Sequence, residues 1–339
     1  MNRIFKFSML LSTVSLVAAC GGGGGGGSSS SPAPGPGTAP AGAVAITAAN
    51  GPTVAAAVDN SLVFAAGAAT QAANAPTAAV VSVTGKQFNI VDFSSTLFEK
   101  INSLKGQLTP TVVGGIITSS SACAGGGSIE VALDDIDNTG ALSSGDQLTL
   151  LYKNCAESGT TINGGLSISS FAFTQPSSVA FTTSGTISFN SFAFSEGSTT
   201  GTMNGRIDFS VSTSDRNLIS STISNATLTI IESGATLTLS GYSINQTDNA
   251  STTAFTLSAS GTVASSALGG SVTFTTTSPY QGTGTANPNT GAIKITGAGS
   301  SVTLTVLDST NIRLDIDSNG DGIMDPPSIT MAWATLDTY

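Results

Sequence analysis

Aspartate is concentrated in two short stretches of this 339-residue chain, at spacings typical of metal ligands. Residues 134–146 and 315–325 hold eight of the 20 acidic residues, although together they cover only 24 positions. Neither stretch contains a lysine or an arginine. Crowded carboxylates repel one another unless a cation lies among them, so both stretches are candidate metal sites.

The second stretch matches the calcium-loop pattern D-x-[DN]-x-[DN]-G and resembles the loops of thrombospondin type 3 and dockerin repeats. The ligands expected from this spacing are Asp317, Asn319, Asp321, the backbone carbonyl of Ile323, and Asp325. Position 12 is Ser328 instead of the usual bidentate glutamate, so the final carboxylate must come from elsewhere, with Asp315 as the candidate. A surface turn rich in aspartate and glycine is the alternative interpretation.

The first stretch can be aligned with the same loop. Its expected ligands, at positions 1, 3, 5, 9 and 12, are Asp135, Asp137, Thr139, Ser143 and Asp146. Aspartate at position 12 is shorter than glutamate, which should weaken calcium binding. The flanking segments alternate like strands, so the pattern indicates an EF-like loop without the helices of an EF-hand, and calcium there would be structural. A polar hairpin loop explains the composition equally well.

The N-terminal residues form a targeting signal, which is set aside before the fold is considered. Arg3 and Lys6 give it a basic start, and an apolar run from about Met9 follows. That run is shorter than the roughly 20 residues that a membrane-spanning helix needs. It ends in Val17-Ala18-Ala19-Cys20, which resembles the lipobox of bacterial lipoproteins. An ordinary secretory signal with a chance cysteine is the alternative.

The lipoprotein resemblance implies that Cys20 carries a thioether-linked diacylglycerol and an amide-linked acyl chain, and more than one chain gives stable anchoring. Gly21, in place of the aspartate common in inner-membrane lipoproteins, favours the outer membrane, on its periplasmic side or at the surface. Residues 20–42 are expected to be a Gly/Ser/Pro-rich tether that reaches roughly 25 Å. Cleavage leaves 8 basic against 20 acidic residues, so we expect an anionic membrane to hold the body off.

Two cysteines remain once Cys20 is lipidated. Cys123 and Cys155 are an even pair, and disulfides persist outside the cytoplasm. We therefore predict a disulfide between them. Two buried free thiols are the alternative.

Several function classes are disfavoured by composition. The chain has no histidine, which removes histidine-based triads and histidine-ligated zinc or haem. A net charge of −10 argues against nucleic acid as a partner. There is no G-x-S-x-G or S-x-x-K motif, which disfavours acyl transfer. Two carboxylates from distant strands could serve a hydrolase, but no feature selects such a pair.

From about Ser128 onward, apolar residues alternate with serine and threonine, which predicts strands with one buried face. The fold class expected is mainly β: a long antiparallel meander, forming a curved open barrel or a sandwich. Two short helices are predicted in residues 43–110, one from Thr53 to Gly67 and one from Ser94 or Ser95 to Gly106. Residues 164–173 and 185–194 show a weak repeat, which fits two strands in similar environments.

These patterns predict a signal peptide in residues 1–19, a tether in 20–42 and a single β-rich domain in 43–339. The arrangement resembles proteobacterial outer-membrane lipoproteins with EF-like or thrombospondin type 3-like loops. It implies a non-enzymatic, calcium-stabilised protein with a structural or adhesive role, and a protein or glycan partner at the envelope. One alternative is a carrier that holds an apolar or lipid ligand under its helices. A carboxylate-dependent hydrolase is the third.

Overall fold

The computed structural model describes most of the body of the chain. The described residues are 42–74, 116–137, 143–157, 160–177, 179–196, 199–215, 217–232, 235–284 and 287–339. The lipidation candidate Cys20 and the second predicted helix, at residues 94–106, lie outside these ranges.

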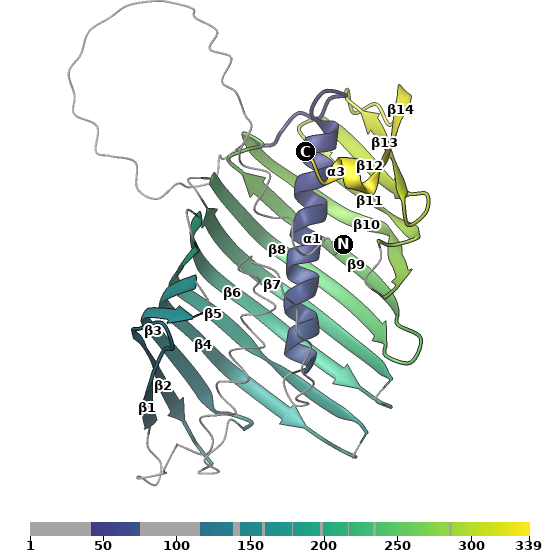
Figure 1. Cartoon of the computed structure of the whole chain (residues 1–339). Helices are drawn as coiled ribbons and strands as arrows, with labels where there is room; N and C mark the ends of the chain where they lie inside the picture. The colour runs from purple at the N-terminus through teal and green to yellow at the C-terminus, as the bar shows by residue number, and fades with distance from the viewer. Residues whose placement is uncertain are drawn as a thin grey trace, which may run out of the picture.

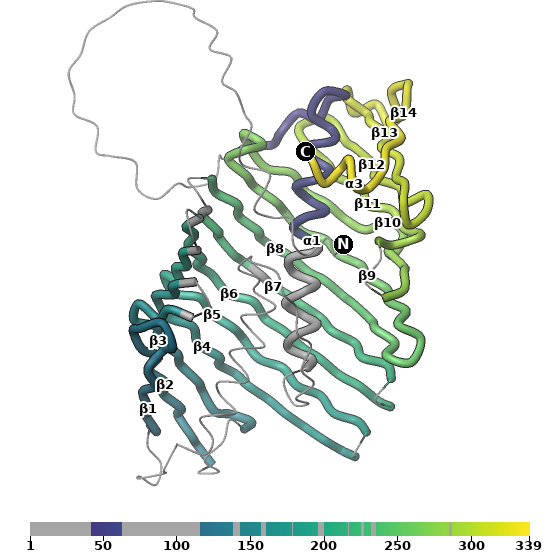
Figure 2. Tube along the Cα trace, viewed as in Figure 1, coloured from purple at the N-terminus to yellow at the C-terminus, as the bar shows by residue number. Residues whose placement is uncertain are grey.

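The body is mainly β, as the sequence predicts, and its strands form one antiparallel sheet in which each strand pairs with the next along the chain (Figures 1 and 2). The strands are β1 (Ile116–Ala122), β2 (Ser128–Asp134), β3 (Gln147–Glu157), β4 (Thr160–Thr174), β5 (Phe181–Glu196), β6 (Thr199–Thr213), β7 (Leu218–Glu232), β8 (Ala235–Asn249), β9 (Ala254–Ser265), β10 (Gly270–Thr283), β11 (Thr290–Gly297), β12 (Ser300–Val306), β13 (Asn311–Asp317) and β14 (Asp325–Ala332).

The alternation of residue types gives the sheet one apolar and one polar face. In β2, Ile129, Val131 and Leu133 are buried, and the residues between them are partly exposed. Inward residues from across the sheet join one apolar cluster, which extends from Ile117 in β1 to Trp333 beyond β14. Burial of this face supplies the main driving force for folding.

The expectation of a sandwich is wrong, and the described sheet does not close into a barrel. All the strands belong to one sheet with β1 and β14 at its edges, because each hairpin places a strand beside the one before it. The sheet is nevertheless curved. Helix α1 (Gly51–Asn74) runs across the strands on one face of the sheet and contacts β6–β9 and also β12 and β13 (Figure 1).

Helix α1 begins at Gly51, two residues before the predicted start, and continues past Gly67 to Asn74. A glycine inside a helix costs only about 1 kcal/mol relative to alanine, and the alanine-rich residues around it favour the helix. Val54, Val58 and Leu62, four residues apart, are buried on one face. The predicted pair of N-terminal helices is not confirmed, because only this one is described. No helix in the described ranges is long and apolar enough to cross a membrane.

A second described helix, α3 (Trp333–Leu336), follows β14 directly. Its first residue, Trp333, is 1% exposed and belongs to the apolar cluster. Helix α3 also contacts α1, so the C-terminal end of the described chain packs against the helix on the curved face.

The weak sequence repeat corresponds to two matching β-bulges. Ser170 in β4 and Ser191 in β5 occupy equivalent places in the repeated segments and have positive φ angles of 52° and 46°. Strand register shifts at both positions. Gly164 faces the second bulge, where a Cβ atom would lie 2.1 Å from the carbonyl oxygen of Ser191. Bulges bend the strands that carry them, so the repeat marks where the sheet curves.

Candidate metal centre

The first acidic stretch forms the loop between β2 and β3, residues 135–146, called here the β2–β3 loop. Asp134 at the end of β2 pairs with Gln147 at the start of β3. This pairing brings the two ends of the loop side by side. Residues 138–142 of the loop, including the predicted ligand Thr139, lie outside the described residues.

Three carboxylates converge in this loop. One oxygen from each of Asp135, Asp137 and Asp146 lies within 4.8 Å of the other two. Asp135 is 2% exposed and Asp146 is fully buried, whereas Asp137 is exposed. Within the described ranges, no other three aspartate, glutamate, cysteine or histidine side chains gather in this way.

Hydrogen bonds fix these carboxylates in place. Asp146 Oδ1 accepts the backbone N–H of Ile136 at 2.9 Å, and its Oδ2 accepts the backbone N–H of Ser143 at 2.7 Å. The Ser143 hydroxyl lies 2.7 Å from Oδ2 of Asp137 and 2.9 Å from Oδ2 of Asp146, so it bridges the two carboxylates. The loop is thereby closed around a small set of oxygen atoms.

The electrostatics of this arrangement suit a cation. Like charges a few ångströms apart repel more strongly inside a protein than in water, because the interior screens them less. Two of the three carboxylates are buried. The predicted ligands Asp135, Asp137, Ser143 and Asp146 are therefore brought together in a site that could hold a metal ion.

A residue that the sequence did not single out fastens this loop to the sheet. The Ser144 hydroxyl accepts the backbone N–H of Phe173 in β4 at 2.8 Å and lies 3.0 Å from the Phe173 carbonyl. The backbone N–H of Gly145 donates to the Phe171 carbonyl at 2.8 Å. No local pattern could reveal this contact, because its partners lie 29 residues apart.

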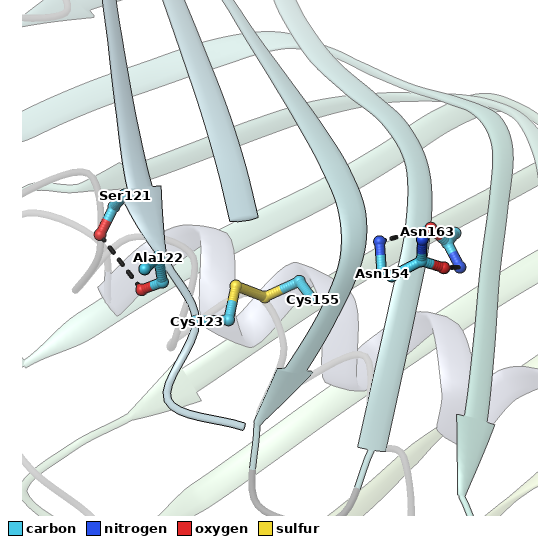
Figure 3. The surroundings of a disulfide bond; sticks show 6 residues. All are labelled: Ser121, Ala122, Cys123, Asn154, Cys155 and Asn163. Atoms are coloured by element: carbon cyan, nitrogen blue, oxygen red, sulfur yellow. Dashed lines mark hydrogen bonds between the residues drawn. A yellow bond between two sulfur atoms is a disulfide. The ribbon is translucent and has the colours of Figure 1, made fainter. Parts of the chain in front are cut away.

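Cys123 and Cys155 are joined by a disulfide, with their Cα atoms 5.4 Å apart, which confirms the predicted pair (Figure 3). Cys123 follows β1, and Cys155 lies in β3 beyond Lys153, which pairs with the first residue of β2. The disulfide therefore ties β1 to β3 at the end of the β2–β3 hairpin opposite the acidic loop. The adjacent Asn154 and Asn163 side chains pair β3 with β4.

The second acidic stretch forms the loop between β13 and β14, residues 318–324, called here the β13–β14 loop. Asp317 precedes it and is 4% exposed. Asp317 Oδ1 accepts the N–H of Gly320 at 2.7 Å, and Oδ2 accepts the N–H of Gly322 at 3.0 Å. Both oxygens of the most buried carboxylate are thus turned toward the backbone of the loop.

The other predicted ligands of this loop also bind the loop itself. Asn319 donates from Nδ2 to Asp321 Oδ2 at 2.9 Å, and Asp321 Oδ1 accepts the N–H of Ile323 at 2.7 Å. Asp325 Oδ2 accepts the N–H of Ser318 at 2.8 Å. Hydrogen bonds from the Ser318 hydroxyl and backbone N–H lower the pKa of Asp325.

Asp315, the predicted source of the last carboxylate, has partners outside the loop. Its Oδ2 accepts Arg313 Nε at 2.9 Å, and its Oδ1 accepts the Ser328 hydroxyl at 2.6 Å. Arg313 lies two residues before the acidic stretch, so it is not among residues 315–325, which contain no lysine or arginine. Residues 315–325 are all described, and no three of their carboxylates gather within 4.8 Å. A metal site in the β13–β14 loop therefore stays a prediction.

Comparison with known proteins adds no relative from which to assign this site. The chain matches no protein-family model, and no curated protein and no solved structure is significantly similar to it. Functional inference must therefore come from the geometry of the chain itself.

Proposed function

We propose that this protein is a non-enzymatic lipoprotein of the outer membrane, anchored through Cys20, whose β-sheet body is stabilised by calcium. Its role is then structural or adhesive at the cell envelope. The observation that carries the proposal is the convergence of Asp135, Asp137 and Asp146 in a loop closed by its own hydrogen bonds.

Calcium fits this site better than a transition metal does. The side chains that converge offer only carboxylate and hydroxyl oxygens, which hard cations prefer, and no nitrogen or sulfur. Magnesium also takes oxygen ligands, but it requires near-octahedral geometry and keeps most of its water. An ion bound only by the folded state raises the free energy of unfolding by about 2.7 kcal/mol at a hundredfold excess over Kd.

Thermal unfolding of the purified chain in calcium, in magnesium and in chelator tests this proposal. We expect calcium to raise the melting temperature well above its value in chelator, and magnesium to raise it less. Asp137→Asn is the informative variant, because Asp137 is exposed and its loss should hardly disturb the fold. Asp134→Asn is the matched control, because Asp134 lies in the same hairpin but outside the converging group.

The expected result is loss of most of the calcium shift in Asp137→Asn and its retention in Asp134→Asn. If calcium left the melting temperature of the parent chain unchanged, calcium would not stabilise the fold and the proposal would be wrong. Equal loss of the calcium shift in both variants would show that calcium acts by general screening of acidic charge and not by binding at this site.

A carrier of an apolar or lipid ligand is the second candidate, favoured by helix α1, which covers one face of the sheet. A described recess of about 290 Å³ lies elsewhere, over β4–β7, with Asn163, Ser195 and Thr202 among its lining residues. Mass spectrometry of the chain under native conditions, followed by solvent extraction, discriminates the two. A co-purified lipid beyond the acyl chains on Cys20 would support the carrier.

A further inference from the structure

We propose that the tip of the β13–β14 loop rests on the surface of the bilayer that holds the lipid anchor, so that the sheet stands on this end. The inference rests on the lipid anchor proposed above. Two features carry it: the place where the tether enters the body, and the side chains exposed beside that place.

The tether joins the body at the same end of the sheet as the β13–β14 loop. The described chain begins at Gly42, whose carbonyl accepts the N–H of Ser271 at 2.7 Å. The Val44 carbonyl accepts the N–H of Ala298 at 2.8 Å, in the turn between β11 and β12. The next residue of that turn, Gly299, packs against the β13–β14 loop at Gly320.

Figure 1 shows the same arrangement: the first described residues, in purple, run along the end of the sheet toward the yellow hairpin of β13 and β14. A flexible tether of about 20 residues has a root-mean-square end-to-end distance of roughly 25 Å. The bilayer therefore lies within reach of this end of the body.

The end of the β13–β14 hairpin exposes a set of apolar side chains, called here the apolar tip. Its members are Ile323, Met324, Pro326 and Pro327. Ile323 is 72% exposed, the highest value among the large hydrophobic residues of the described chain, and Met324 is 40% exposed. Single exposed hydrophobic residues are common, but here four exposed apolar residues lie within five positions at one end of the hairpin.

The tether removes the need for strong intrinsic affinity. A contact too weak to form in dilute solution becomes populated when a short linker raises the local concentration to the millimolar range. The acidic side chains of Asp321 and Asp325 beside the tip oppose close approach to anionic headgroups. We therefore expect contact with a largely zwitterionic surface, and stronger contact with anionic lipid when calcium is present.

A single labelled cysteine can report this contact, because Cys20 carries lipid and the other two cysteines form a disulfide. The lipidated chain with Ile323→Cys carries a polarity-sensitive fluorophore and is reconstituted in vesicles of phosphatidylethanolamine with a minor fraction of phosphatidylglycerol. Some lipids bear a nitroxide quencher. Leu307→Cys is the matched control: Leu307 is 44% exposed in the turn before β13, at the opposite end of that strand.

We expect several-fold stronger quenching at position 323 than at position 307, and its loss when Met324→Asp is added to the labelled chain. Equal quenching at both positions would overturn the tip contact and leave the anchor standing. Flotation with the vesicles tests the anchor separately: the lipidated chain should float and Cys20→Ser should not. A lipidated chain that fails to float would overturn the proposed function and this inference together.

Discussion

The β2–β3 loop and the β13–β14 loop carry similar acidic sequences but arrange their carboxylates differently. In the β2–β3 loop, three carboxylates lie close to one another, and a serine hydroxyl bridges two of them, Asp137 and Asp146. In the β13–β14 loop, each carboxylate is turned toward a backbone N–H of the same loop or toward a neighbouring side chain. Asp146 and Asp317 each accept two backbone N–H groups, but three carboxylates converge only in the β2–β3 loop, and this concentrates charge that a cation relieves.

In these two loops, a closer match to the first six positions of the calcium-loop pattern does not go with closer convergence of the carboxylate oxygens. The β13–β14 loop fits D-x-[DN]-x-[DN]-G at every fixed position but has Ser328 at position 12, whereas the β2–β3 loop departs from the pattern at position 5 and has an aspartate at position 12. The loop that fits the first six positions less well has the convergent oxygens. The residue that makes the difference is Asp146, which reaches back across the hairpin to Ile136 and Ser143.

Matched alanine variants of Asp146 and Asp317, one buried carboxylate from each loop, should give the largest effect on stability. Asp146 and Asp317 each accept two backbone N–H groups, so Asp146→Ala and Asp317→Ala should each cost about 1–3 kcal/mol in chelator. With calcium at a hundredfold excess over Kd, only Asp146→Ala should lose a further 2.7 kcal/mol or so. Denaturant unfolding with and without calcium measures both losses. An equal calcium-dependent loss would show that the two loops bind alike.

Removal of the disulfide should have the next largest effect. Cys123 and Cys155 are 32 residues apart, and a cross-link of this length stabilises by roughly 3–4 kcal/mol through the unfolded chain. The double serine variant should unfold at correspondingly lower denaturant but keep the full calcium increment, because the metal candidate lies at the other end of the hairpin. Loss of that increment in the variant would mean that the disulfide organises the β2–β3 loop.

A smaller effect on stability is expected when the buried hydroxyl of Ser301 is removed. Ser301 is the cross-strand partner of Asp317, and its hydroxyl is buried without a hydrogen-bond partner. Ser301→Ala should therefore leave the free energy of unfolding unchanged or raise it by about 1 kcal/mol. If this variant instead lowers stability only in calcium, the hydroxyl serves an ion and the β13–β14 loop gains a site.

The smallest expected effect concerns acid. The pKa of Asp325 is lower in the folded chain than in the unfolded chain, so the unfolded chain is protonated first at this residue as the pH falls. The stabilisation from this carboxylate is therefore present above pH 3.8 and is lost as the pH falls through its lower folded pKa. Asp325→Asn should flatten this part of the stability curve, measured in chelator. Asp308 also has a pKa lowered by hydrogen bonds, mainly from the Thr310 N–H, and lies outside both loops. A flatter curve in Asp308→Asn but not in Asp325→Asn would contradict the assigned hydrogen bonds.

What could be predicted from the sequence was local. Alternation of residues such as Ile129, Val131 and Leu133 set the strands and their buried face, and Gly51-Pro52 marked the start of a helix. What could not be predicted depends on partners distant in the chain. The contacts of α1 with strands more than 100 residues later are encoded in no local pattern.

The same limit applies to the candidate site. Spacing within the β2–β3 loop predicted that Asp135, Asp137 and Asp146 would meet, because a tight loop brings such positions together. The pairing of Asp315 with Arg313 follows from strand geometry, since residues two apart lie on the same face. A search confined to acidic windows missed it.

The strict order of the strands bears on how the molecule is made. Every described strand bonds only to strands next to it in the chain, so no pairing has to wait for a distant segment to be synthesised. Strands can join the growing edge hairpin by hairpin as the polypeptide is synthesised. Under mechanical load the sheet should come apart from an edge strand. Because the disulfide ties β1 to β3, we expect β14 to separate first.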